Sequence, residues 1–119
     1  MKKEDQNLFY SKLGETIRLE RKKNKLSQDE VAEHLGFTRI SIVNIEQGKQ
    51  KIQLHSLIEL AILFQIDVTE LLAPSYVVIL NTKIPLAQKN FINEIEQLDN
   101  KEIGSDILNS FMRYSYFKK

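Results

Sequence analysis

The hydrophobic residues in the first part of the chain recur with the spacing of amphipathic helices. Between residues 8 and 24 they fall every three or four positions, which predicts a helix with one buried stripe that ends near Asn24. Ser27 and Glu30 then have the spacing of a capping box, in which each side chain bonds the backbone amide of the other residue. A second, short helix is therefore expected to begin at Ser27, and Gly36 to end it in a tight turn.

Two more helices follow with weaker but consistent signals. Thr38 can cap a third helix, which would place Ile42 and Ile45 one turn apart on its inner face and end near Gly48. The run LHSLIELAILF at 54–64 is apolar around most of a helix circumference. This run predicts a fourth helix at the centre of the core.

The segment around Pro74 is expected to divide the chain. Asp67 and Glu70 repeat the capping pattern and predict a fifth helix, which Pro74 should end after Leu72. The run YVVIL at 76–80 is compatible with a short strand or with an apolar linker, and residues 85–98 and 102–117 again have helical spacing. We therefore expect an all-α fold, with five helices in a domain of residues 8–73 and a mostly helical extension over 74–119.

The composition removes several kinds of chemistry. The chain has no cysteine and two histidines, which excludes disulfides, thiolate nucleophiles and cysteine metal sites. There is no glycine-rich phosphate loop and no paired-carboxylate motif, so the protein is not expected to be an enzyme or to hold a metal or cofactor. The polar N-terminus and the lack of a long apolar run favour a cytoplasmic protein without membrane contact.

The charge distribution is more informative than the net charge, which is +1. Basic residues are concentrated in 18–25 and again in 39–51. A solvated helix face explains any single run of this kind, so the charges alone do not indicate nucleic-acid binding.

Two short helices joined by a tight turn define a helix-turn-helix, in which the second helix can enter the DNA major groove. Residues 14–72 resemble the helix-turn-helix domain of the phage Cro and repressor group, also called the xenobiotic-response-element family. The matching stretches are IRLERKKNKLSQDEVAEHLGFTRISIVNIEQGKQ and LIELAILFQIDVTELL. The resemblance implies a five-helix, lambda-repressor-like domain and a regulator of transcription that binds double-stranded DNA in a sequence-specific way.

The third helix, at about 38–47, is the expected recognition helix. Its inward isoleucines leave four side chains on the face that can meet a groove. Arginine can make a bidentate contact to guanine, asparagine to adenine, and an aliphatic side chain can pack on a thymine methyl group. The residues expected to contact bases are Arg39, Ile40, Val43 and Asn44.

Other residues are expected to support this helix. Gln28 stands in the first turn of its helix, where backbone amides and a side-chain amide can hold a phosphate oxygen together. The resemblance implies the same role for Gln28, and a salt bridge between Arg21 and Glu46 that orients the recognition helix. The candidate phosphate contacts are Gln28, Thr38, Ser41, Lys49 and Lys51.

The extension over 74–119 carries more apolar surface than a helical hairpin can bury alone. We expect it to pack on a second copy, giving a homodimer on a palindromic operator, with repression of transcription as the outcome. The residues assigned to this dimer contact are Phe91, Ile95, Ile107, Phe111 and Tyr114. Three alternatives remain open: the extension completes a monomeric core, the protein is an antitoxin, or the fold serves as an interaction module whose extension binds a protein or peptide.

Overall fold

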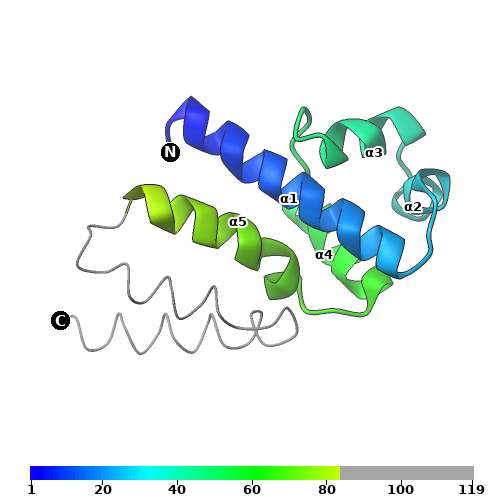
Figure 1. The fold of residues 1–119 in the computed structure, drawn as a ribbon. Coiled ribbons are helices and arrows are strands. Elements are labelled where there is room, and N and C mark those ends of the chain that lie inside the picture. The colour runs from blue at the N-terminus through cyan, green and yellow to red at the C-terminus, as the bar shows by residue number, and fades with distance from the viewer. Residues whose placement is uncertain (84–119) are drawn as a thin grey trace.

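The computed structural model describes residues 1–83, which form five α-helices and no strand. Figure 1 shows the two longest helices lying side by side and the three shorter ones gathered at one end. The expectation of an all-α fold is confirmed for this part of the chain, while residues 84–119 lie outside the described range. The helices are α1 Lys3–Lys23, α2 Gln28–Leu35, α3 Arg39–Glu46, α4 Leu54–Phe64 and α5 Val68–Lys83.

One hydrophobic core joins all five helices. α1 packs along α5 and crosses α3, while α2 contacts both α3 and α4. Burying these side chains supplies most of the driving force for folding. The buried hydrophobic cluster consists of Leu13, Ile17, Val31, Ala32, Ile42, Ile45, Leu57, Leu60, Ala61, Phe64 and Leu71.

The starts of α2 and α3 expected from the sequence are confirmed. The Glu30 amide donates to the Ser27 hydroxyl at 3.0 Å and the Ser27 amide donates to the Glu30 carboxylate at 3.0 Å, which completes the capping box. The bond from the Ser27 amide, with a smaller effect of the Ser27 side chain, lowers the pKa of the exposed Glu30 carboxyl. Gly36 ends α2 in the left-handed conformation, and Thr38 caps α3.

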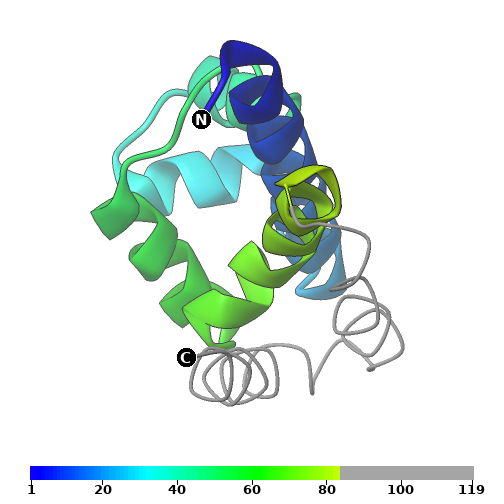
Figure 2. The ribbon, with the colours of Figure 1, turned by 90° about the vertical axis from the view of Figure 1, so that its left-hand side faces the viewer.

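The expected end of the fifth helix at Pro74 is wrong. Pro74 lies inside α5, which continues to Lys83, so 76–80 is helical and is neither a strand nor a linker. The proline lacks the amide that would bond the Glu70 carbonyl, and Figure 2 shows α5 changing direction along its length, as expected for a helix that contains proline. The helix continues because its later turns bury Val77, Ile79 and Leu80.

The last turn of α5 reaches the start of α1. The ammonium group of Lys83 lies 3.0 Å from the carboxylate of Asp5, and both belong to the described helices. α1 also begins five residues before the predicted Leu8, at Lys3. The boundary proposed between residues 73 and 74 therefore falls within α5.

Ser75 offers a test of packing in α5. Its side chain is fully buried, and within residues 1–83 its hydroxyl has no hydrogen-bond partner. Because an unsatisfied buried hydroxyl costs free energy, Ser75→Ala should raise the free energy of unfolding by about 1 kcal/mol. Urea denaturation followed by circular dichroism measures this change. As a contrast, Ser27→Ala removes the cap of α2 and should lower the free energy of unfolding by about 1 kcal/mol. A loss of stability in Ser75→Ala would contradict this account.

α4 is central to the core, as its sequence predicts, but through one face only. It buries one face through Leu57, Leu60, Ala61 and Phe64, but the opposite face stays exposed although it is also apolar. Its start at Leu54 follows Gln53, which makes no side-chain capping bond, in agreement with the weak cap that isoleucine and glutamine provide there.

Candidate nucleic-acid interface

The short helix α3 is presented on a rigid base. Thr38 precedes it, and the Thr38 hydroxyl accepts a hydrogen bond from the Ser41 amide at 3.2 Å. The inner face of α3 buries Ile42 and Ile45 against the core. The outer face is therefore held at a fixed orientation by side chains that face the opposite way.

The four candidate base contacts lie on this outer face or at its border. Arg39 is exposed, and Ile40 has 72% of its surface open to solvent although it is a large aliphatic residue. Val43 and Asn44 are half-buried. Within residues 1–83, no hydrogen bond engages the side chains of Arg39 or Asn44, which leaves their donor groups able to bind another molecule.

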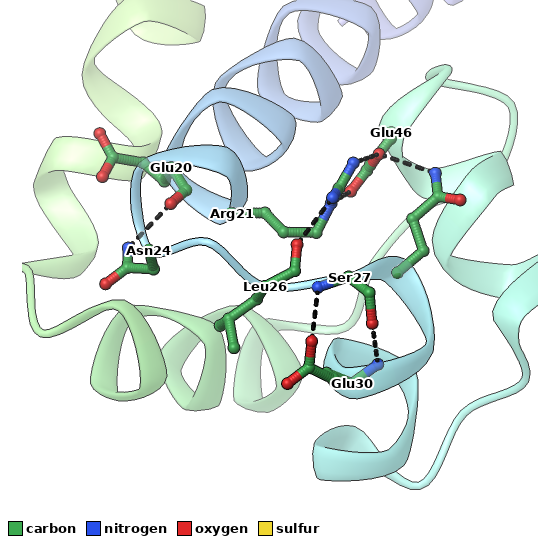
Figure 3. Close-up of polar contacts among 8 residues, drawn as sticks. Glu20, Arg21, Asn24, Leu26, Ser27, Glu30 and Glu46 are labelled. Atoms are coloured by element: carbon green, nitrogen blue, oxygen red, sulfur yellow. Dashed lines mark hydrogen bonds and ion pairs between the residues drawn. The ribbon is translucent and has the colours of Figure 1, made fainter.

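Arg21 and Glu46 form a buried ion pair between α1 and the end of α3 (Figure 3). The Arg21 Nε donates to Glu46 Oε2 at 2.6 Å and its Nη2 donates to Oε1 at 3.1 Å, which is bidentate geometry. The remaining nitrogen, Nη1, donates to the Leu26 carbonyl at 2.9 Å. Arg21 thus joins α1, the turn before α2 and the end of α3.

Gln28 extends this network to α2. Its Nε2 donates to Glu46 Oε1 at 3.1 Å, so one carboxylate is shared between a side chain of α1 and one of α2. Gln28 is half-buried and is the first residue of α2. The sequence suggested a phosphate contact for Gln28 but not this bond, which depends on the packing of α2 against α3.

Three of the candidate phosphate contacts surround α3. Thr38 is exposed and Ser41 half-buried, and the Thr38 hydroxyl donates to the Ser41 hydroxyl at 3.1 Å. Lys49 is exposed just beyond the other end of the helix, where its amide donates to the Asn44 carbonyl at 2.8 Å. Thr38 and Ser41 thus lie at the start of α3 and Lys49 lies just beyond its end.

Lys51 is placed differently from the other candidates. Its ammonium group donates to the Gln6 side-chain oxygen at 3.0 Å and lies 5.8 Å from the centre of the Tyr10 ring. Both partners belong to α1, so Lys51 ties the segment after α3 to the first helix. A phosphate contact by Lys51 would have to compete with these interactions or form beside them.

Gly14 is a supporting residue that the sequence reasoning missed. A Cβ atom at this position would lie 2.3 Å from the Ile45 carbonyl oxygen and 2.6 Å from that of Glu46. α1 and α3 therefore approach so closely that only glycine fits between them. The available signal was a glycine in the middle of a helical pattern, where it lowers helix propensity.

The comparison with protein families agrees with this geometry. Residues 17–71 match a family described as helix-turn-helix, in agreement with the resemblance to the Cro and repressor group. No curated protein matches the chain. The chain thus carries the domain of a DNA-binding helix-turn-helix regulator.

Two further observations concern the described part of the chain alone. Residues 1–83 contain no group of three or more His, Asp or Glu side chains that could hold a metal ion. Over the same range, no helix has the length and apolar character needed to cross a bilayer. The residues assigned to a dimer contact, Phe91, Ile95, Ile107, Phe111 and Tyr114, lie outside the described range.

Proposed function

We propose that the protein is a sequence-specific regulator of transcription that represses by occupying operator DNA, with α3 as the recognition helix. The observation that carries the proposal is the outer face of α3. It presents Arg39 and the 72% exposed Ile40, while Ile42 and Ile45 are buried on the other face. An exposed arginine beside an exposed aliphatic residue suits a groove edge that offers guanine acceptors and a thymine methyl group.

The buried hydrogen-bond network supports this role because it fixes the orientation of α3, whose outer face would contact the bases. Arg21, Glu46 and Gln28 connect the end of α3 to α1 and to the start of α2. Gln28 is thereby held at a helix N-terminus, where backbone amides can bind a phosphate oxygen. Phosphate contacts set the register of a protein on DNA, and base contacts then read the sequence.

A homodimer on a palindromic operator is part of the proposal. One helix-turn-helix reads few base pairs, whereas two-fold dimers read half-sites ~34 to 36 Å apart. We assign residues 8–73 to DNA binding and residues 74–119 to an extension that assists dimerisation or binds a protein partner. The cytoplasmic location expected from the sequence remains part of this proposal.

Arg39→Ala and Lys49→Ala should separate base reading from phosphate binding. Selection from random double-stranded oligonucleotides with the full chain first identifies the preferred sequence. Arg39→Ala should then weaken binding to that sequence by ~1 to 3 kcal/mol and relax the preference at one base pair. Lys49→Ala should weaken binding to all sequences alike and reduce its salt dependence. Fluorescence anisotropy measures both effects. Failure of the wild-type protein to enrich any sequence would refute direct base reading.

A further inference from the structure

The segment that joins α3 to α4 is attached to the end of α3 by backbone hydrogen bonds. The Lys49 amide donates to the Asn44 carbonyl at 2.8 Å. The Gly48 amide donates to the Ile45 carbonyl at 3.1 Å. These bonds fix the direction in which the segment leaves the proposed recognition helix, and the exposed candidate phosphate contact Lys49 stands within it.

Gly48 places the same segment directly against the first half of α1. Its backbone is left-handed, with a φ of 76°, and a Cβ atom there would lie 2.6 Å from the Cα of Ser11 and 2.8 Å from the Ser11 amide nitrogen. Both atoms belong to the backbone of α1, so only glycine permits this approach. The segment is therefore in contact with α1 on the N-terminal side of Lys49.

Lys51 forms a second attachment of the segment to α1. Its ammonium group donates to Gln6 Oε1 at 3.0 Å and lies 5.8 Å from the centre of the Tyr10 ring. Gln6 and Tyr10 are four residues apart, so they lie one turn apart on the same side of α1. The Tyr10 ring packs edge to face with Phe9, with 5.2 Å between the ring centres, and both rings pack against the core. Lys51 is thus attached to a side chain that is itself held in place.

The two attachments lie on either side of Lys49 in the sequence. Fixing the backbone on both sides of a side chain reduces the conformational freedom that is lost when it binds another molecule. Within residues 1–83, no hydrogen bond or ion pair engages the Lys49 ammonium group, whereas that of Lys51 is bound to α1. Their partners Gln6, Tyr10 and Ser11 precede residue 14, where the resemblance to the Cro and repressor group begins.

We propose that Lys51 is a positioning residue: held by Gln6 and Tyr10 of α1, it fixes the segment after α3 so that Lys49 contacts a DNA phosphate. The proposal rests on the proposed function, since it assigns Lys49 to DNA. A direct phosphate contact by Lys51 would not need Gln6 or Tyr10, because a lysine released from them is free to reach the DNA. Positioning by Lys51 depends on both partners.

Gln6→Met and Tyr10→Leu remove the two partners of Lys51 without changing any charge. Asn7→Met is the matched control, because Asn7 is an exposed amide residue next to Gln6 on α1. With the full chain on its preferred DNA sequence, Gln6→Met and Tyr10→Leu should each raise the dissociation constant about threefold or more. Each should also reduce the salt dependence of binding, as Lys49→Ala does, because the contact of Lys49 with phosphate is weakened. Asn7→Met should leave both quantities unchanged.

The same measurement in a Lys49→Ala background separates positioning from a general loss of stability. If Lys51 acts through Lys49, then Gln6→Met and Tyr10→Leu should have little further effect on the dissociation constant in that background. Urea denaturation establishes that each variant is folded at the temperature of the binding experiment. A purely structural effect on the domain would weaken binding whether or not Lys49 is present.

The outcomes separate this inference from the proposed function. Wild-type or tighter binding by either Gln6→Met or Tyr10→Leu would overturn the role of Lys51, and so would an equal loss with and without Lys49. Neither result affects base reading by Arg39. If the wild-type protein enriches no sequence, base reading fails, and the same variants are then compared on any duplex at low salt, because phosphate contacts do not depend on sequence. Absence of all DNA binding would overturn both proposals.

Discussion

Replacing Glu46 by alanine is expected to lower the free energy of unfolding by about 3 to 5 kcal/mol. The side chain of Glu46 is 3% exposed and accepts hydrogen bonds from both Arg21 and Gln28. Removing the carboxylate leaves the buried Arg21 guanidinium without its counter-ion, and a buried unpaired charge is costly. Urea denaturation at low temperature, followed by circular dichroism, measures the loss.

A surface pair provides the control for Glu46→Ala. Lys23 lies 3.3 Å from Glu20, and its side chain is largely exposed, so Lys23→Ala should cost less than about 1 kcal/mol. A double-mutant cycle adds a stricter test, because Arg21→Ala together with Glu46→Ala should cost less than the sum of the two single variants. If the double variant loses as much stability as the two single variants together, Arg21 and Glu46 do not stabilise each other.

Gly14→Ala should destabilise the domain by about 3 kcal/mol, although alanine is the better helix former. The added methyl group would meet the carbonyl oxygens of Ile45 and Glu46, which are backbone atoms and cannot rotate away. α1 and α3 would have to separate, which would also shift the recognition helix. Denaturation measures the loss of stability, and anisotropy on the selected DNA should show weaker binding.

The neighbouring residue serves as the control for Gly14→Ala. Glu15 is exposed on the same turn of α1, so Glu15→Ala should change stability by less than about 0.5 kcal/mol. A Gly14→Ala protein as stable as the wild type would mean that α1 and α3 can move apart at little cost.

Features that depend on local sequence were predictable. The capping box of Ser27 and Glu30, the left-handed turn at Gly36 and the start of α3 at Thr38 all involve residues within one helical turn. The side of α3 that faces outward followed from the burial of Ile42 and Ile45, because helix periodicity assigns the faces.

Features that depend on packing between distant segments were not predictable. A proline usually ends a helix, but at Pro74 the packing of α5 against α1 outweighs this local preference. The bond between Gln28 and Glu46 and the contact of Lys51 with Gln6 join residues that are far apart in the sequence. The exposure of Ile58 on α4 was not predictable either. When a helix is apolar on several faces, the spacing of its apolar residues does not show which face packs against another helix.

The ion pair between Lys83 and Asp5 has a consequence for how the domain unfolds. It joins the start of α1 to the end of α5, and the two helices also pack along each other, so one of these two ends cannot detach without exposing the other. Helix ends commonly fray at low energetic cost, whereas segments that protect each other open together. Amide hydrogen exchange in the early turns of α1 and the late turns of α5 should therefore be slow, and both should open in a single cooperative event.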